Sequence, residues 1–356
     1  MGKCFSKQSV AGSPGRYLTH TTELQTPSYS PSSSQASVST GFDGLGLRRS
    51  RSTRQGRTGS SALQPHEIQQ AAYQLAVRLN GTPIENASER QRLADATATV
   101  HETRLALHRG RGNVDSDLRR SGGRSAAYSS ISYCLGEDDN HLLAGSALAL
   151  GAGNCDHNAM INARRHAVRM EDDGQMISVR DYEQSHLYAL YKPPGVDSAD
   201  ESAVVLDSWT WSDGPAVLLR DSCWAQTYGT ATHVVEQLDK DAAIDALALS
   251  NAFKDEIEDP RTALHADARD MESAFLANHA PGAIFSAMPV IATDLAETTR
   301  ERLQEYSPRT RQALAADAAR QAYGLDDAQA SSPRTTAAIL EDAERLDALG
   351  RPPLSW

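Results

Sequence analysis

The sequence predicts an α+β fold in which one helix packs on a short antiparallel sheet, with further helices before and after it. Three observations predict this class. Residues 175–180, 185–191 and 202–207 read as short strands separated by turn-forming residues. On both sides of these strands, apolar residues recur at helical intervals. The chain has 356 residues, of which 40% are hydrophobic, and this is enough apolar material for a sizeable core.

The first sixty residues differ from the rest of the chain in composition and charge. They hold eight basic residues and two acidic ones, whereas the whole chain has a net charge of −11. Residues 27–40 are Ser-rich and of low complexity, and they cannot bury enough apolar surface to offset the entropy of ordering. We therefore expect residues 1–60 to be a disordered leader. The acidic remainder argues against a partner that is a nucleic acid.

The N-terminus carries a lipidation pattern. The start Met1-Gly2-Lys3-Cys4-Phe5-Ser6 fits the motif for N-myristoylation of Gly2. One myristoyl chain holds a protein on a membrane only marginally, so stable anchoring needs a second signal. Cys4, as a palmitoylation site, and the basic residues of the leader are both candidates for it; a chance match at a disordered terminus is the alternative. No apolar run approaches the ~18–20 residues that cross a bilayer, and no secretory signal core is present.

Helices are expected before the strands, in a subdomain with a linker at 61–124. From Pro65 the apolar residues fall on one helical face up to a stop at 80–83, and a second helix is expected from about Ser88 to His108. The Gly-, Arg- and Ser-rich stretch 109–124 is the predicted linker to a core at 125–232. From about Thr232 the chain is Ala-rich and charged. It predicts a helical region at 233–356, packed on the core, with helices at 242–253, 262–277, 293–306, 310–323 and 335–349.

Cys155 lies at the predicted start of a helix. Residues 142–152 are helical in pattern and end at Gly151-Ala152-Gly153, after which the spacing of apolar residues predicts a helix from near Cys155 to Met170. Asn154 is well suited to be its N-cap. A thiol in the first turn of a helix lies near unpaired N–H groups and the positive end of the helix dipole, which favours the thiolate.

The second and third strands place a histidine near a carboxylate. If 185–191 and 202–207 pair about the middle of the loop between them, His186 lies opposite Asp207 and Leu190 lies opposite Ala203. A slip of one residue would put His186 and Asp207 on opposite faces. Acyl transfer through sulfur needs a thiolate, a histidine that exchanges protons, and a third group that fixes the imidazole tautomer. Cys155, His186 and Asp207 supply these three types.

The remaining cysteines and histidines are expected to be structural. Four cysteines without a CxxC pair make neither a disulfide framework nor a zinc site, and no grouping of His, Cys and Asp has ligand spacing. No metal and no cofactor are therefore implied. Cys134 and Cys223 read as buried, inert thiols.

The segments around the three candidate residues also resemble a known family. They are similar to the Cys, His and Asp segments of transglutaminase-like and papain-like bacterial effectors, and most of all to the AvrPphE/HopX/XopE family of type III secreted effectors from plant pathogens. The start Met1-Gly2-Lys3-Cys4 resembles the members of that family that attach to the host plasma membrane. The segments that carry the likeness are Gly153-Asn154-Cys155-Asp156-His157-Asn158-Ala159, Ser185-His186-Leu187-Tyr188, Val204-Val205-Leu206-Asp207-Ser208-Trp209 and Gly214-Pro215-Ala216-Val217.

This resemblance implies a transglutaminase-like (papain-like) core with Cys155 as nucleophile, His186 as general base and acid, and Asp207 as the residue that orients the imidazole. It also implies secretion into the host cell through the bacterial type III secretion apparatus, and action on a host plant protein to suppress immunity. Thiol protease, deamidase and transglutaminase all share the Cys thioester, so the triad does not choose among them. The alternative is a catalytically inactive, membrane-tethered interaction module that binds a host partner. A second donor for the oxyanion hole is not evident from the sequence.

Overall fold

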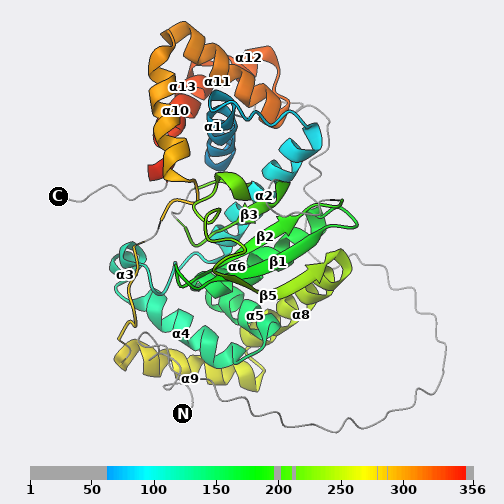
Figure 1. Ribbon diagram of the computed structural model, residues 1–356. Coiled ribbons are helices and arrows are strands. Elements are labelled where there is room, and N and C mark those ends of the chain that lie inside the picture. The colour runs from blue at the N-terminus through cyan, green and yellow to red at the C-terminus, as the bar shows by residue number, and fades with distance from the viewer. Residues whose placement is uncertain (1–61, 196–201, 211–213, 279, 287, 350–356) are drawn as a thin grey trace, which may run out of the picture. The chain divides into compact units, whose positions relative to one another are not determined.

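The computed structural model describes residues 62–195, 202–210, 214–278, 280–286 and 288–349, and Figure 1 shows their arrangement. The predicted leader, with Gly2 and Cys4, lies outside the described residues. The described residues belong to one compact unit that begins at Ser52. Within them the fold is α+β: helices predominate around a single five-stranded antiparallel sheet of order β4-β3-β2-β1-β5. The strands are β1 (Gln175–Asp181), β2 (His186–Lys192), β3 (Val204–Leu206), β4 (Val217–Leu218) and β5 (Thr232–Asp239).

The helices gather in three places around this sheet (Figure 1). Helix α6 packs on β1 and β2, while α5 lies between α4 and α8. Helix α9 packs on α4, and α10, α11 and α13 pack on α1. The helices are α1 (Pro65–Leu79), α2 (Ala87–Ala106), α3 (Asp115–Ser121), α4 (Arg124–Gly136), α5 (Asn140–Leu150), α6 (Cys155–Arg165), α8 (Lys240–Glu258), α9 (Ala263–Asn278), α10 (Thr293–Glu305), α11 (Pro308–Tyr323), α12 (Asp327–Ala330) and α13 (Pro333–Glu344). Short 3₁₀ turns span η1 (His166–Arg169), η2 (Leu219–Asp221) and η3 (Leu346–Ala348).

Local sequence signals explain where several helices begin and end. Helices α11 and α13 both start with Pro at their first position, where the missing N–H costs nothing, and each is preceded by a serine whose hydroxyl accepts from an N–H three residues on. Helix α11 ends at Gly324 and α5 at Gly151, both in the left-handed region that glycine adopts without strain.

The apolar core joins the sheet to the helices. The largest cluster of buried apolar side chains extends from β1–β4 into α1, α10, α11 and α13. A smaller cluster lies around α6 and includes Met160, Ile161, Leu148 and Leu187. Because α6 is anchored through this second cluster to both α5 and β2, its first turn is held in a fixed place at the end of the sheet.

The structure differs from the sequence-based expectations in several places. The helix expected from Cys155 to Met170 ends at Arg165, and the 3₁₀ turn η1 follows it. Residues 232–239 form β5 and not the start of the helical region, because this segment pairs with β1 along its whole length. The expected linker 109–124 contains α3, and α4, which was not expected, follows it at once. The region 233–356 does not pack on the core as one body. Helices α8 and α9 pack on α5 and α4, whereas α10, α11 and α13 pack on α1.

Candidate active site

Cys155 is the first residue of α6. The chain leaves α5 at Gly151, and Asn154 then adopts an extended conformation immediately before the helix. The Asn154 N–H donates to Nδ1 of His157 at 3.0 Å, which fixes the first turn. Gly153 is required here, since a Cβ at this position would lie 2.6 Å from the Cβ of His157. The Cys155 side chain, in the first turn of this helix, is half-buried.

His186 and Asp207 meet at the ends of neighbouring strands. His186 is the first residue of β2, Asp207 directly follows β3, and the two side chains are buried, with exposed fractions of 3% and 2%. The imidazole Nε2 lies 2.7 Å from Oδ2 of Asp207. The Cys155 side chain lies close enough to the ring to contribute to its raised pKa. Because Nε2 is engaged by Asp207, Nδ1 is the ring nitrogen that remains for a second partner. The structure therefore brings the three predicted residues together.

The register that suggested this pair is wrong by two residues. In β2 and β3, Leu190 pairs with Val205 and not with Ala203, and Ala189 pairs with Leu206. A register shift of two residues keeps every side chain on its face of the sheet. His186 and Asp207 are therefore diagonal neighbours and still form a hydrogen bond. The predicted contact survives because the period of a strand is two.

Asp207 decides the charge of His186. Burial on its own lowers the pKa of this imidazole, but the Asp207 carboxylate and, to a smaller extent, Cys155 outweigh that effect and raise the pKa to about 10. The ring therefore carries its second proton at neutral pH, and the buried carboxylate balances the charge. A charged imidazole beside a sulfur is the arrangement that stabilises a thiolate.

Aromatic rings enclose the imidazole. Trp224 stacks on it with ring centroids 4.6 Å apart, and Trp209 lies tilted against it at 4.9 Å. Tyr188 is parallel to the ring at a centroid distance of 6.2 Å. Both indoles are almost fully buried. They keep water from the His186–Asp207 bond, which strengthens the electrostatic interaction between the two groups.

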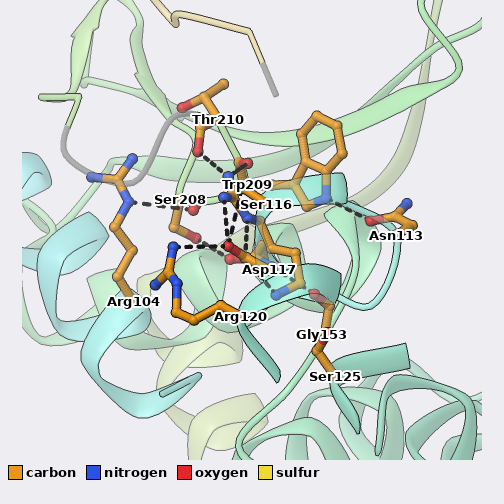
Figure 2. Close-up of polar contacts among 12 residues, drawn as sticks. Arg104, Asn113, Ser116, Asp117, Arg120, Ser125, Gly153, Ser208, Trp209 and Thr210 are labelled. Atoms are coloured by element: carbon orange, nitrogen blue, oxygen red, sulfur yellow. Dashed lines mark hydrogen bonds and ion pairs between the residues drawn. The ribbon is translucent and has the colours of Figure 1, made fainter. Parts of the chain in front are cut away.

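Two arginines hold the segment that carries Asp207. Arg104, in the last turn of α2, donates to the carbonyls of Asp207, Ser208 and Gly214 at 3.2, 3.3 and 2.7 Å. Arg111 donates from one nitrogen to the carbonyls of Trp209 and Thr210, both at 2.6 Å, and is paired with Asp117 at 2.7 Å. Figure 2 shows this cluster, with Asp117 between Trp209 and Arg120.

These contacts set the orientation of the Asp207 carboxylate. The N–H of Trp209 donates to Oδ1 at 3.1 Å, which leaves Oδ2 for the imidazole. Ser208 links the same segment to α6, because its hydroxyl donates to Oδ1 of Asn158 at 2.7 Å and accepts from Asn162 at 3.0 Å. The helix that carries the sulfur and the segment that carries the acid are thus joined directly.

A second carboxylate lies beside Cys155. Asp156 accepts a hydrogen bond from the Tyr133 hydroxyl at 2.5 Å and another from the backbone N–H of His157 at 3.1 Å. Burial raises the pKa of Asp156, but bonds to His157 and Tyr133 outweigh this and bring it down to about 2. Burial, Asp156 and Cys155 in turn raise the pKa of Tyr133 well above its usual value. This cluster keeps a neutral phenol and an ionised carboxylate next to the sulfur.

The other described cysteines do not take part. Cys134, Cys155 and Cys223 form no disulfide with one another. Burial, and then the nearby Asp207, raise the pKa of the Cys223 thiol far above its usual value, so this thiol stays protonated at neutral pH. His166 is buried at the end of α6 and His157 inside its first turn, in agreement with the structural roles expected for both.

The sequence did not point to several residues of the site. Arg111 lies in Gly110-Arg111-Gly112, in the stretch predicted to be a linker, and no pattern in the sequence singles out Trp224. The flanking glycines of Arg111 were the available signal, because they allow the chain to run close to its neighbours.

The chain matches no family model, no curated protein and no solved structure. Among the described residues no group of three or more His, Cys, Asp or Glu side chains is arranged to hold a metal ion. None of the helices in the described ranges is both long and apolar enough to span a bilayer.

Proposed function

We propose that this chain is a cysteine enzyme that transfers acyl groups through a thioester on Cys155, with His186 and Asp207 completing a triad in a transglutaminase-like core. The observation that supports this most strongly is the buried imidazole of His186, which is bonded to Asp207 at 2.7 Å and lies near enough to Cys155 for that side chain to raise its pKa further. A structural histidine needs neither a half-buried thiol nearby nor a buried carboxylate on Nε2.

The arrangement assigns a role to each group in the reaction. The sulfur attacks the carbonyl carbon of an amide, and the C=O electron pair moves onto oxygen. When this tetrahedral species collapses, the C–N bond breaks and the imidazolium of His186 gives its proton to the departing amine. The neutral imidazole then removes a proton from water, or from an acceptor amine, as it attacks the thioester. The C–S bond breaks when this second tetrahedral species collapses, which releases the acyl product and restores the thiolate beside the imidazolium. Asp207 holds the ring in place throughout.

The proposed substrate is a protein of a plant host cell. The resemblance of the Cys, His and Asp segments and of the lipidation start supports a type III secreted effector that acts at the host plasma membrane, as a thiol protease, deamidase or transglutaminase. Removal of the acceptor amine by Gly2→Ala should shift the protein from the membrane to the soluble fraction of host cells. Unchanged fractionation would contradict the lipid anchor.

Selective chemistry at Cys155 tests the catalytic part of the proposal. The full-length protein is treated near pH 7 with iodoacetamide, and alkylation of each cysteine is followed by peptide mass spectrometry. Cys155 should react fastest, and hydrolysis of p-nitrophenyl acetate should be lost in Cys155→Ala. The matched control is Cys223→Ala, because Cys223 is also half-buried but its raised pKa keeps it protonated.

Equal alkylation of all cysteines, or ester hydrolysis that survives in Cys155→Ala, would contradict an enzyme that works through Cys155. Retention of the effect in host cells by Cys155→Ala would instead support the inactive interaction module.

A further inference from the structure

We infer that the side-chain amide of Asn113 is the second donor of the oxyanion hole, together with the backbone N–H of Cys155. This inference rests on the proposed function, since an oxyanion forms only if Cys155 attacks a carbonyl. The first donor follows from the position of Cys155: its N–H is in the first turn of α6, where N–H groups have no acceptor within the helix.

The segment that carries Asn113 runs beside the segment that leads to Cys155. Gly110 and Ala152 form a parallel β-bridge, and the N–H of Gly153 donates to the carbonyl of Gly110 at 3.3 Å. Asn113 follows this bridge by three residues on one segment, and Cys155 follows it by three residues on the other. Figure 2 shows Asn113 next to Trp209, joined to its indole nitrogen.

The orientation of the Asn113 amide is fixed by chemistry. The indole Nε1 of Trp209 lies 3.0 Å from Oδ1 of Asn113. An indole N–H can only donate, so the atom that faces it must be the amide oxygen, and the NH₂ group points to the other side. The side chain of Asn113 is half-buried. The backbone carbonyl of the same residue accepts from the N–H of Phe285 at 2.8 Å, and this bond fixes the backbone at Asn113.

The same indole links Asn113 to the triad. The Trp209 ring lies against the imidazole of His186 at a centroid distance of 4.9 Å, and Cys155 is near enough to that imidazole to raise its pKa. Asn113, Trp209, His186 and Cys155 therefore form a continuous set of neighbours around the position where a carbonyl would be attacked. Asn113 is a catalytic residue in this account, and Trp209 is a positioning residue that turns the NH₂ group toward the developing charge.

The test compares two reactions of the same sulfur. Alkylation by iodoacetamide displaces iodide from carbon and forms no oxyanion. In acylation by p-nitrophenyl acetate the sulfur attacks the carbonyl carbon, the electron pair moves to oxygen, and p-nitrophenolate then leaves; water hydrolyses the thioester to acetate and restores the sulfur. Loss of an oxyanion donor should therefore slow acylation and leave alkylation unchanged.

The variant is Asn113→Asp, in which a carboxylate oxygen still accepts from Trp209 but the donor is replaced by a negative charge. We expect the rate of acylation of Cys155 to fall about 10²-fold or more, the loss that follows removal of one oxyanion donor, while the rate of alkylation stays within about twofold. Asn278→Asp is the matched control, since Asn278 is an exposed asparagine at the end of α9, and both of its rates should equal those of the wild type.

A second variant guards against a change in folding. Trp209→Phe keeps an aromatic ring against His186 but removes the N–H that orients the amide, so acylation should fall by a smaller factor than in Asn113→Asp. Equal loss of both reactions in Asn113→Asp, or no loss of acylation, would overturn the role of Asn113. Absence of selective reaction at Cys155 in the wild type would instead overturn the proposed function itself.

Discussion

Two buried histidines lie at opposite ends of the same helix, α6, and differ in charge. His186 faces the first turn of α6, and its pKa is raised to about 10 because Asp207 and Cys155 outweigh its burial. His166 directly follows the last turn of α6, and burial, together with the nearby Arg169, lowers its pKa to about 3. Both rings are almost inaccessible, with exposed fractions of 3% and 1%. Burial is therefore common to both, and the partner decides the charge.

The partner of His166 is a hydroxyl. Its Nδ1 lies 3.1 Å from Oγ1 of Thr99, whose proton is donated to the carbonyl of Asp95 at 3.0 Å. Thr99 must then accept from the imidazole, so His166 is held as the neutral Nδ1–H tautomer. The neutral ring of His166 is bonded to a neutral hydroxyl and contributes to the packing of η1 on α2. The charged ring of His186 lies near both a carboxylate and a sulfur, which is the environment that proton transfer requires. The lesson is that a histidine in the core must be judged by its partners.

The largest expected effect comes from removing the partner of His186. In Asp207→Asn the amide cannot balance the charge, so burial is opposed only by the smaller effect of Cys155, and the pKa of His186 should fall toward or below its ordinary value of about 6.5. The turnover of p-nitrophenyl acetate should fall about 10⁴-fold, as in triads that lose the orienting carboxylate. NMR titration of the imidazole and steady-state kinetics measure the two effects. A His186 resonance that still titrates near pH 10 in this variant would contradict the assigned cause.

The next effect concerns the arginine that holds the Asp207 segment. Arg111→Met should lower the free energy of unfolding by about 3–5 kcal/mol, because Asp117 and two carbonyls would stay buried without their partner. The pKa of His166, to which Arg111 does not contribute, should stay unchanged. The control is Arg120→Met, which removes an exposed partner of the same Asp117 and should change the stability by about 0–1 kcal/mol. Denaturant unfolding and the same NMR titration test this pair, and equal losses in both variants would refute the role of Arg111.

The smallest of the three effects is the acid sensitivity caused by His166. Its pKa is about 3 in the folded chain and about 6.5 in the unfolded chain, so between these values the unfolded chain binds the extra proton. Stability from the neutral ring is complete above pH 6.5 and is lost as the pH falls toward 3; at pH 4 the loss is on the order of 3 kcal/mol. His166→Gln should reduce the drop in melting temperature between pH 7 and pH 4. His233→Gln, at an exposed position on β5, should leave that drop unchanged.

The sequence was sufficient for elements with strong local signals. Proline at the first position and a regular apolar face predicted α1 from Pro65 to Leu79, as observed. The start of α6 at Cys155 followed from the glycines and the asparagine before it, and β1 and β2 were placed within one residue at each end. The proximity of His186 and Asp207 was also predictable, because a slip of two residues in register does not change the face.

Elements that depend on distant partners were missed. Strand β5 has exposed side chains at most positions and owes its conformation to pairing with β1, which no local pattern reveals. Arg111 is buried only because the carbonyls of Trp209 and Thr210, about a hundred residues further along the chain, converge on it. Asn113 likewise gains its place through Trp209. The groups that position the proposed catalytic side chains are thus supplied by tertiary contacts, whereas the start of the helix that carries Cys155 is encoded locally.

Peptide mapping of the protein after brief exposure to p-nitrophenyl acetate tests most directly whether the buried imidazole serves the sulfur. We expect an acetyl group on Cys155 of the wild type, little or none on Cys134 or Cys223, and a strongly reduced amount when His186 is replaced by Ala. Acetylation of Cys155 that is independent of His186, or that appears first on another cysteine, would contradict the account.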